Sequence, residues 1–305
     1  MTYRCRKWLY ARVLGASPSP PITIIKLQIR KMAMLTSEQV LHFHTFGFLV
    51  VKRAFSLKEV QDITNVFDQS MLEDRDGQPF DGEERQAIFG LVERNPYLVN
   101  LIVDQRIFGA INQLFGPGFL WTASDANYWV GDTQWHPDRH NLTWALIKAT
   151  LYLDPVTKDT GCLRVIPGSH QMPFHANLMP LDSRRQTSDL KPNNGQGGSF
   201  GLAGQDAPSV SLETVPGDLI FFHQNLWHSS FGGRSGRRQL SLSYGENPVT
   251  DDQMAQVHQM YKANLSNATE RANVESDHLY GDALMTNEDP QINAVAQRLI
   301  EIGLK

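Results

Sequence analysis

Cysteine is scarce in this 305-residue chain, which contains only Cys5 and Cys162. Two cysteines so far apart exclude a disulfide-stapled scaffold and a cysteine-rich zinc site, and they favour a reducing compartment. Long apolar runs are also absent, because no run approaches the roughly 18 residues that would cross a bilayer. The sequence therefore predicts a protein without a membrane segment and with a cytoplasmic location.

Positive charge is in short supply as well. The chain has 28 Lys and Arg against 32 Asp and Glu, which gives a formal net charge of −4. A nucleic-acid binder gains affinity from clustered Lys and Arg that neutralise phosphates, and no basic stripe occurs after residue 40. Nucleic acid is therefore excluded as a partner. The apolar content of 41% is ordinary for a globular protein with a sizeable core.

Acidic residues are missing from the first 37 residues, which contain several Arg and Lys and the helix-breaking stretch Ser17-Pro18-Ser19-Pro20-Pro21. This composition is typical of an organelle transit peptide, which would make the protein mitochondrial. The alternative is a start codon placed too early, because Met32 and Met34 come directly before the first clear structural signal. In both cases residues 1–34 are predicted to lie outside the fold.

Helix signals come first along the chain and strand signals follow. Thr36-Ser37-Glu38-Gln39 and Ser56-Leu57-Lys58-Glu59 are capping boxes, and a third helix is predicted over residues 96–115. A strand is predicted at residues 48–51, between the first two helices. Further strands are predicted at residues 119–130, 145–154, 162–166, 211–215, 219–223 and 237–244. This order predicts a mainly β chain, an antiparallel sandwich or barrel with flanking helices.

The polar, Gly- and Asn-rich residues 181–208 cannot build a core. They are predicted to form a long loop that is either a functional lid or simply mobile. Residues 251–305 return to helical patterning. We therefore expect one domain over residues 35–305, with this lid and a helical C-terminal segment.

Thr133-Gln134-Trp135-His136-Pro137-Asp138 raises the question of a metal site. On an extended chain, side chains two residues apart lie on one face, so His136 and Asp138 can meet at a single point. A third ligand could come from His223 or His228, which follow Pro216-Gly217-Asp218. These histidines are five residues apart and face opposite sides of an extended strand, so only one of them can look inward.

Three further motifs follow His136 and Asp138 in a fixed order. They are Thr160-Gly161-Cys162-Leu163-Arg164-Val165-Ile166-Pro167-Gly168-Ser169-His170, the Gly217-Asp218 turn with its two histidines, and Arg237-Arg238-Gln239-Leu240-Ser241. Over about residues 35–248 the chain resembles the phytanoyl-CoA dioxygenase family of Fe(II)- and 2-oxoglutarate-dependent oxygenases. The resemblance implies a double-stranded β-helix, a jelly-roll barrel with iron in its mouth.

The resemblance also implies the metal ligands, His136, Asp138 and His228, which would be the catalytic centre. Two histidines and one carboxylate leave three positions of an octahedral iron open for a co-substrate and dioxygen. His223 is then a structural residue at a strand end. His140 and His170 are expected to be structural too.

2-Oxoglutarate needs a cation for its C5 carboxylate, and the resemblance assigns this role to Arg237. A guanidinium suits it because it grips a carboxylate with two parallel hydrogen bonds and stays charged when buried. Strand alternation places polar residues on one side (Arg237, Gln239, Ser241, Ser243) and residues suited to packing on the other (Arg238, Leu240, Leu242, Tyr244). Further 2-oxoglutarate contacts implied by the family are Gln134, Thr150 and Ser230.

The implied activity is oxidation of an aliphatic C–H bond of a small-molecule metabolite, by default hydroxylation, with 2-oxoglutarate converted to succinate and CO₂. Asp138 argues against halogenation, because halogenases of this fold have Gly or Ala at that position. The alternative is a cupin-type jelly roll, an isomerase or a sensor, that binds a metal without 2-oxoglutarate. A buried Arg237 opposite the metal distinguishes the two, since a cupin does not need it. A small molecule is the expected partner, and a homo-oligomer is compatible with the sequence.

Overall fold

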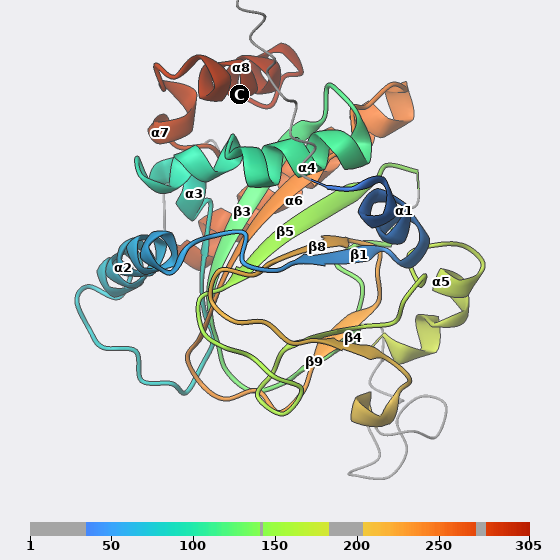
Figure 1. Cartoon of the computed structure of the whole chain (residues 1–305). Coiled ribbons are helices and arrows are strands. Elements are labelled where there is room, and N and C mark those ends of the chain that lie inside the picture. The colour runs from blue at the N-terminus through green and yellow to red at the C-terminus, as the bar shows by residue number, and fades with distance from the viewer. Residues whose placement is uncertain (1–34, 141–142, 183–203, 273–278) are drawn as a thin grey trace, which may run out of the picture. The chain divides into compact units, whose positions relative to one another are not determined.

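The computed structural model describes residues 35–140, 143–182, 204–272 and 279–305 (Figure 1). The N-terminal extension predicted for residues 1–34 and most of the predicted lid lie outside the described residues. No described helix is long and apolar enough to cross a membrane.

Two capping boxes open the first two helices, as predicted. Thr36 caps α1 (Ser37–Phe46) and Ser56 caps α2 (Leu57–Glu73), and in each the cap and the third helical residue exchange side-chain and backbone hydrogen bonds. Gly47 ends α1 with φ at 82°, a left-handed conformation that glycine adopts without strain. Strand β1 (Phe48–Val51) follows directly.

The third helix was predicted wrongly in extent. Residues 91–115 form three short helices, α3 (Leu91–Arg94), the 3₁₀ helix η1 (Leu98–Ile102) and α4 (Gln105–Phe115). The break lies at Asp104, whose side chain accepts a hydrogen bond from the backbone N–H of Arg106 and so caps α4. Asp is a preferred N-cap residue, and this local signal overrides the apolar periodicity that runs across it.

The strands form two antiparallel sheets, which confirms the predicted mainly β fold with flanking helices. A six-stranded sheet has the order β1-β8-β5-β10-β3-β2 and a four-stranded sheet has the order β4-β9-β6-β7. The first contains β8 (Leu219–His223), β5 (Leu146–Tyr152), β10 (Arg237–Gly245), β3 (Leu120–Trp129) and β2 (Gln86–Phe89). The second contains β4 (Thr133–His136), β9 (His228–Ser230), β6 (Leu163–Val165) and β7 (Val210–Leu212).

Helices cover one face of the six-stranded sheet, as Figure 1 shows for α3 and α4. On β10, Leu240, Leu242 and Tyr244 point to this side and belong to the main apolar cluster together with residues of α2, α4 and α8. The C-terminal segment predicted as helical contains α6 (Asp251–Ala272), α7 (Asp282–Met285) and α8 (Pro290–Glu301). Short helices α5 (Phe174–Asn177), η2 (Met179–Leu181) and η5 (Gly204–Asp206) lie between β6 and β7 in sequence.

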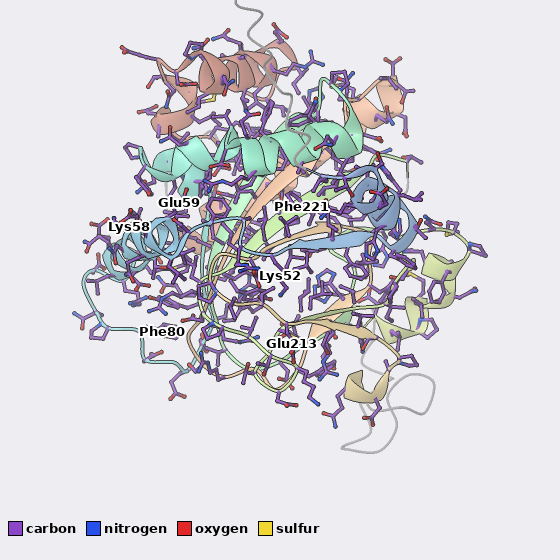
Figure 2. The ribbon with its side chains drawn as sticks, viewed as in Figure 1. Lys52, Lys58, Glu59, Phe80, Glu213 and Phe221 are labelled. Carbon is purple, nitrogen blue, oxygen red and sulfur yellow. The ribbon has the colours of Figure 1, made fainter. Side chains whose placement is uncertain are left out.

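Side chains separate cleanly between interior and surface. Figure 2 shows Phe221 of β8 in the interior and Lys58 and Glu59 on the outer side of α2. Phe221 is fully buried, whereas the Lys58 side chain is 80% exposed. The opposite face of the six-stranded sheet carries the polar side of β10, including Arg237 and Gln239. Residues of this polar face and of the four-stranded sheet line one common cavity.

Candidate active site

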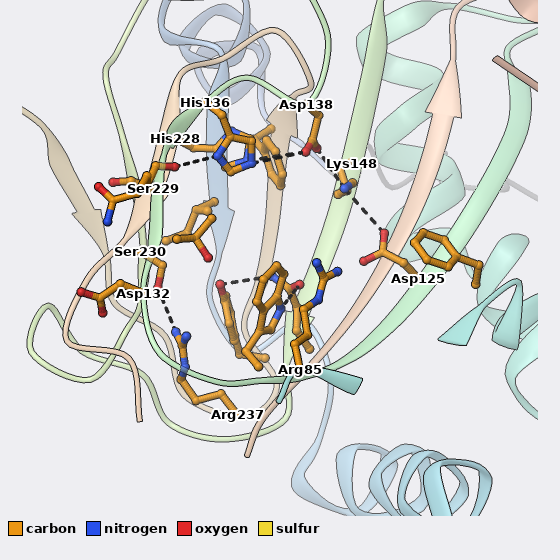
Figure 3. A pocket seen from close by; sticks show the side chains of 18 of the residues that line it. Arg85, Asp125, Asp132, His136, Asp138, Lys148, His228, Ser229, Ser230 and Arg237 are labelled. Carbon is orange, nitrogen blue, oxygen red and sulfur yellow. Dashed lines mark hydrogen bonds and ion pairs between the residues drawn. The ribbon is translucent and has the colours of Figure 1, made fainter. Parts of the chain in front are cut away.

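A cavity of about 620 Å³ lies between the two sheets. Strands β2, β3, β5, β8 and β10 of one sheet and β4, β6 and β9 of the other line it, and Asn267 of α6 also reaches it. His136, Asp138 and His228 lie at one end and Arg237 at the other (Figure 3). The cavity therefore joins the two halves of the predicted site.

Strand pairing brings the two predicted histidine ligands together. His136, the last residue of β4, pairs directly with His228, the first residue of β9. Asp138 follows two residues later, beyond Pro137. One potential ligand atom from each of these residues lies within 4.8 Å of the others, and in the described part of the chain no other group of three His, Cys, Asp or Glu residues does so.

The distances from Asp138 to the two histidines fit a single metal ion. Asp138 Oδ1 lies 3.9 Å from His136 Nε2 and 3.7 Å from His228 Nε2. Metal bonds to imidazole nitrogen and carboxylate oxygen are about 2.1 Å long. Two ligand atoms on one ion therefore lie at most about 4.2 Å apart, and both measured distances are below that limit.

Backbone carbonyls fix the orientation of both rings. His136 Nδ1 lies 2.7 Å from the carbonyl oxygen of Gln134, and His228 Nδ1 lies 2.8 Å from that of Leu226. A carbonyl can only accept, so Nδ1 carries the proton in both rings and Nε2 is the nitrogen that can coordinate a metal. Burial and the nearby His136 lower the pKa of His228 to about 3, so this ring is neutral at neutral pH.

The other histidines make structural contacts. His223 accepts a hydrogen bond at Nδ1 from the backbone N–H of Asn225, and its ring lies beside His170. His140 Nε2 lies 2.8 Å from Asp182 Oδ2, and its Nδ1 lies 3.3 Å from His175 Nε2. None of these rings belongs to the group around Asp138.

Arg237 is a buried cation with only 1% of its surface exposed. Its guanidinium donates to the carbonyl oxygens of Arg234 at 3.2 Å, Gly131 at 2.6 Å and Gly161. Among the described residues, no carboxylate lies within ion-pair distance of it. A Cβ on Gly161 would collide with the guanidinium, so this glycine makes room for the arginine. Burial lowers the pKa of Arg237.

Arg237 cannot donate two parallel hydrogen bonds to a ligand while it keeps all of its contacts with the protein. Ser230 Oγ accepts from Arg237 Nη1 at 2.8 Å and itself donates to the carbonyl oxygen of Gly161 at 2.8 Å. A guanidinium has five N–H groups, and the protein occupies four of them. One Nη2–H remains, and a second bond to a ligand requires an exchange of one protein contact.

The predicted 2-oxoglutarate contacts differ in position. Gln134 and Ser230 line the cavity. Thr150 is fully buried, its hydroxyl lies 2.9 Å from Ser241 Oγ, and it is not among the residues that line the cavity. Gln134 and Ser230 are therefore exposed to the cavity, whereas Thr150 is not.

Sequence reasoning missed two charged residues at the metal end, Lys148 and Asp125. Lys148 Nζ lies 2.9 Å from Asp138 Oδ2 and 3.6 Å from Asp125 Oδ2. Burial alone would lower the pKa of Lys148, but Asp125 and Asp138 raise it above its ordinary value. Burial alone would raise the pKa of Asp138, but Lys148 and the two histidines lower it overall. The available signal was a single charged residue, Lys148, inside the otherwise uncharged strand β5 (Leu146–Tyr152).

Sequence reasoning also missed Tyr152 and Arg85, which line the same cavity. Gln239 Nε2 donates to the Tyr152 hydroxyl at 3.1 Å, and burial raises the pKa of Tyr152 to about 12. The Arg85 guanidinium lies 3.8 Å from the ring centre of Trp129. The cavity wall is therefore a mixture of aromatic and charged groups.

Solved structures with the same fold include several iron and 2-oxoglutarate enzymes. HygX from Streptomyces hygroscopicus, with nickel and 2-oxoglutarate bound, is 18% identical with a TM-score of 0.55, and the match covers 71% of this chain and 89% of that one. EctD from S. alaskensis with bound Fe is 22% identical with a TM-score of 0.53, covering 72% and 80%. SnoK, a non-heme alpha ketoglutarate dependent carbocyclase from nogalamycin biosynthesis, is 20% identical with a TM-score of 0.51, covering 73% and 90%.

At these identities the likeness establishes the fold, which is the predicted double-stranded β-helix. No curated protein matches the sequence significantly. The family model described as Phytanoyl-CoA dioxygenase (PhyH) matches residues 43–240, which is well over half of the chain and includes all three residues of the metal group and Arg237. The chain belongs to the phytanoyl-CoA dioxygenase family, and it is a 2-oxoglutarate-dependent non-haem iron dioxygenase.

Proposed function

We propose that this enzyme binds Fe(II) through His136 Nε2, Asp138 Oδ1 and His228 Nε2, and that it oxidises an aliphatic C–H bond of a small-molecule metabolite. Hydroxylation is the proposed outcome, coupled to decarboxylation of 2-oxoglutarate to succinate and CO₂. One observation carries this proposal. Three metal donors lie at one end of the cavity, and a buried guanidinium that has no carboxylate partner among the described residues lies at the other.

The donor set suits ferrous iron. Two imidazoles and one carboxylate on one face of an octahedral ion leave three positions for other ligands, and bound iron would activate dioxygen for attack on a C–H bond. The backbone carbonyls of Gln134 and Leu226 hold the two rings with Nε2 towards this point. Because the rings are fixed in advance, the site needs little rearrangement to take up the ion.

Arg237 supports 2-oxoglutarate as the co-substrate. Leaving a buried charge without a partner is costly, and a carboxylate at this end of the cavity would remove that cost. The C5 carboxylate would accept from the remaining Nη2–H and, when Ser230 turns away, also from Nη1. Ser230 would then donate to the same carboxylate. Gln134 is proposed as a second polar contact. Thr150 does not line the cavity, so its proposed effect is indirect, through its hydrogen bond with Ser241.

The remaining wall favours a small organic substrate. A volume of about 620 Å³ lies within the range of small-molecule sites, roughly 300–1,000 Å³. Phe89, Trp129 and Phe222 supply apolar surface in the cavity. Asp138 is a carboxylate where a halogenase has Gly or Ala, so we propose C–H oxidation without halogen transfer. A cytoplasmic location remains part of this proposal.

An anaerobic binding experiment tests the proposal. Fe(II) and 2-oxoglutarate added together to the wild-type protein should give the weak visible charge-transfer band of the chelate. Asp138→Ala should give no band, because one of three metal ligands is lost, and it should lose succinate formation as well.

The surface variant Asp62→Ala serves as a control, since Asp62 pairs with Lys58 on α2 far from the cavity lining, and it should keep the band. Absence of the band in the wild type, with metal nevertheless bound, would favour the cupin alternative. An Asp138→Ala variant with wild-type band and turnover would refute the ligand assignment.

A further inference from the structure

Lys148 touches the carboxylate that the proposed metal would use. It lies on β5, opposite Phe222 of β8 and Ser243 of β10, and its side chain is only 17% exposed. Its ammonium lies 2.9 Å from Asp138 Oδ2. Figure 3 shows Lys148 between Asp138 and Asp125, at the metal end of the cavity.

The two oxygens of Asp138 have different neighbours. Oδ1 faces both imidazoles, at 3.9 Å from His136 Nε2 and 3.7 Å from His228 Nε2. Oδ2 faces the Lys148 ammonium. One oxygen is therefore directed to the metal position and the other to a cation of the protein.

This division matters because of the number of positions on the metal. If both oxygens of Asp138 bound the ion, the protein would fill four of six positions and leave two. 2-Oxoglutarate chelates through two oxygens, so dioxygen would have no position. A carboxylate held to one oxygen keeps the third position open.

Other residues hold Lys148 in turn. Lysine has a flexible four-carbon side chain, and Asp125 Oδ2 lies 3.6 Å from its ammonium on the side away from Asp138. Asn127 Nδ2 donates to Asp125 Oδ1 at 2.7 Å, and Arg85 Nε donates to Asn127 Oδ1 at 3.0 Å. The chain of contacts runs from the cavity wall at Arg85 to the metal ligand.

The geometry points to Lys148 as a positioning residue that binds Asp138 Oδ2, limits this ligand to one metal bond and thereby keeps a coordination position open for the co-substrates, with Asp125 fixing Lys148. This inference rests on the proposed function, since it assumes a metal between His136, Asp138 and His228.

Two quantities measured on the full-length protein test the inference. In Lys148→Met the ammonium no longer competes for Asp138 Oδ2 and no longer repels a dication. Co(II), used anaerobically as a probe without turnover, should therefore bind as tightly as in the wild type or about tenfold more tightly. 2-Oxoglutarate should still give the chelate band with Fe(II), because two positions remain. Asp138 then takes the position that dioxygen needs, so the band should decay at least about tenfold more slowly after mixing with dioxygen.

Two matched variants act as controls. Lys148→Arg retains the charge next to Asp138 Oδ2 and should restore most of the wild-type rate of band decay. Lys52→Met removes a Lys–Asp contact of the same 2.9 Å length, to Asp218, outside the main cavity and should change neither quantity. If Lys148→Met does not fold, Asp125→Asn should still slow the decay of the band, since it weakens the contact with Lys148 without changing the shape of residue 125.

Weaker Co(II) binding in Lys148→Met would overturn the inference, and so would a chelate band that decays at the wild-type rate after mixing with dioxygen. If the wild-type protein gives no chelate band, the proposed function itself fails. A normal wild-type band, together with a Lys148→Met band that decays at the wild-type rate, defeats only the positioning role.

Discussion

At the scale of single residues, adjacent arginines on β10 have opposite environments. Arg237 points between the sheets and is held by backbone carbonyls and Ser230. Arg238 points to the other side and forms ion pairs with Asp68 at 2.7 Å and Asp154 at 2.8 Å. Strand alternation predicts this difference. Of these two arginines, only Arg237 has no carboxylate within ion-pair distance among the described residues.

This contrast gives a paired prediction. Arg237→Met should raise the KM for 2-oxoglutarate by at least about 100-fold, because removing one partner of a buried ion pair costs about 3–5 kcal/mol. Metal affinity should stay unchanged. Steady-state succinate formation and metal titration measure these two quantities.

Arg238→Met serves as the control and should lower the free energy of unfolding while leaving the KM for 2-oxoglutarate at the wild-type value. Equal effects of the two substitutions on this KM would show that Arg237 does not hold the co-substrate.

At the scale of elements, predictability depended on how apolar the local sequence is. The strand at residues 219–223 was predicted with its observed bounds, since four consecutive apolar residues precede His223 after a clear turn. The four-residue β1 was predicted as well, because it is apolar throughout. Strands β2, β4 and β9 were not predicted, because each contains polar residues and is too short to show an alternating pattern. β9 nevertheless carries His228, and only the motif around it indicated its role.

Helix α2 offers a prediction about pH. Hydrogen bonds from Ser56, together with Arg106, lower the pKa of Glu59 to about 2, against about 4.3 in an unfolded chain. A lowered folded-state pKa contributes stability that is fully present above the unfolded value and is lost as the pH falls towards 2. Glu59→Gln should therefore destabilise the protein between pH 5 and 8, estimated from these two values, and the difference from wild type should shrink between about pH 4 and pH 2.

Chemical denaturation at several pH values measures this effect. Ser56→Ala removes the largest contribution to the lowered pKa, so it should flatten the pH dependence as well as cost about 1 kcal/mol as a lost N-cap. A Glu59→Gln difference that is the same at pH 2 and pH 7 would contradict the assigned cause.

At the scale of the whole molecule, the fold assembles a site from distant parts of the sequence. Four strands, β5 to β8, lie between Asp138 and His228 in the sequence, yet pairing of β4 with β9 places His136 opposite His228. The family motifs could predict these ligands and Arg237, because each has a recognisable local sequence. Lys148 and Asp125 lie on separate strands of the larger sheet and have no motif of their own. Only the three-dimensional arrangement brings them to Asp138.

The most direct test of the account is an anaerobic crystal structure of the wild-type protein with Mn(II), as a stand-in for Fe(II), and 2-oxoglutarate. We expect the ion to be bound by His136 Nε2, one oxygen of Asp138 and His228 Nε2. The C5 carboxylate of 2-oxoglutarate should lie on Arg237. An ion bound elsewhere, or a 2-oxoglutarate whose C5 carboxylate does not reach Arg237, would contradict the account.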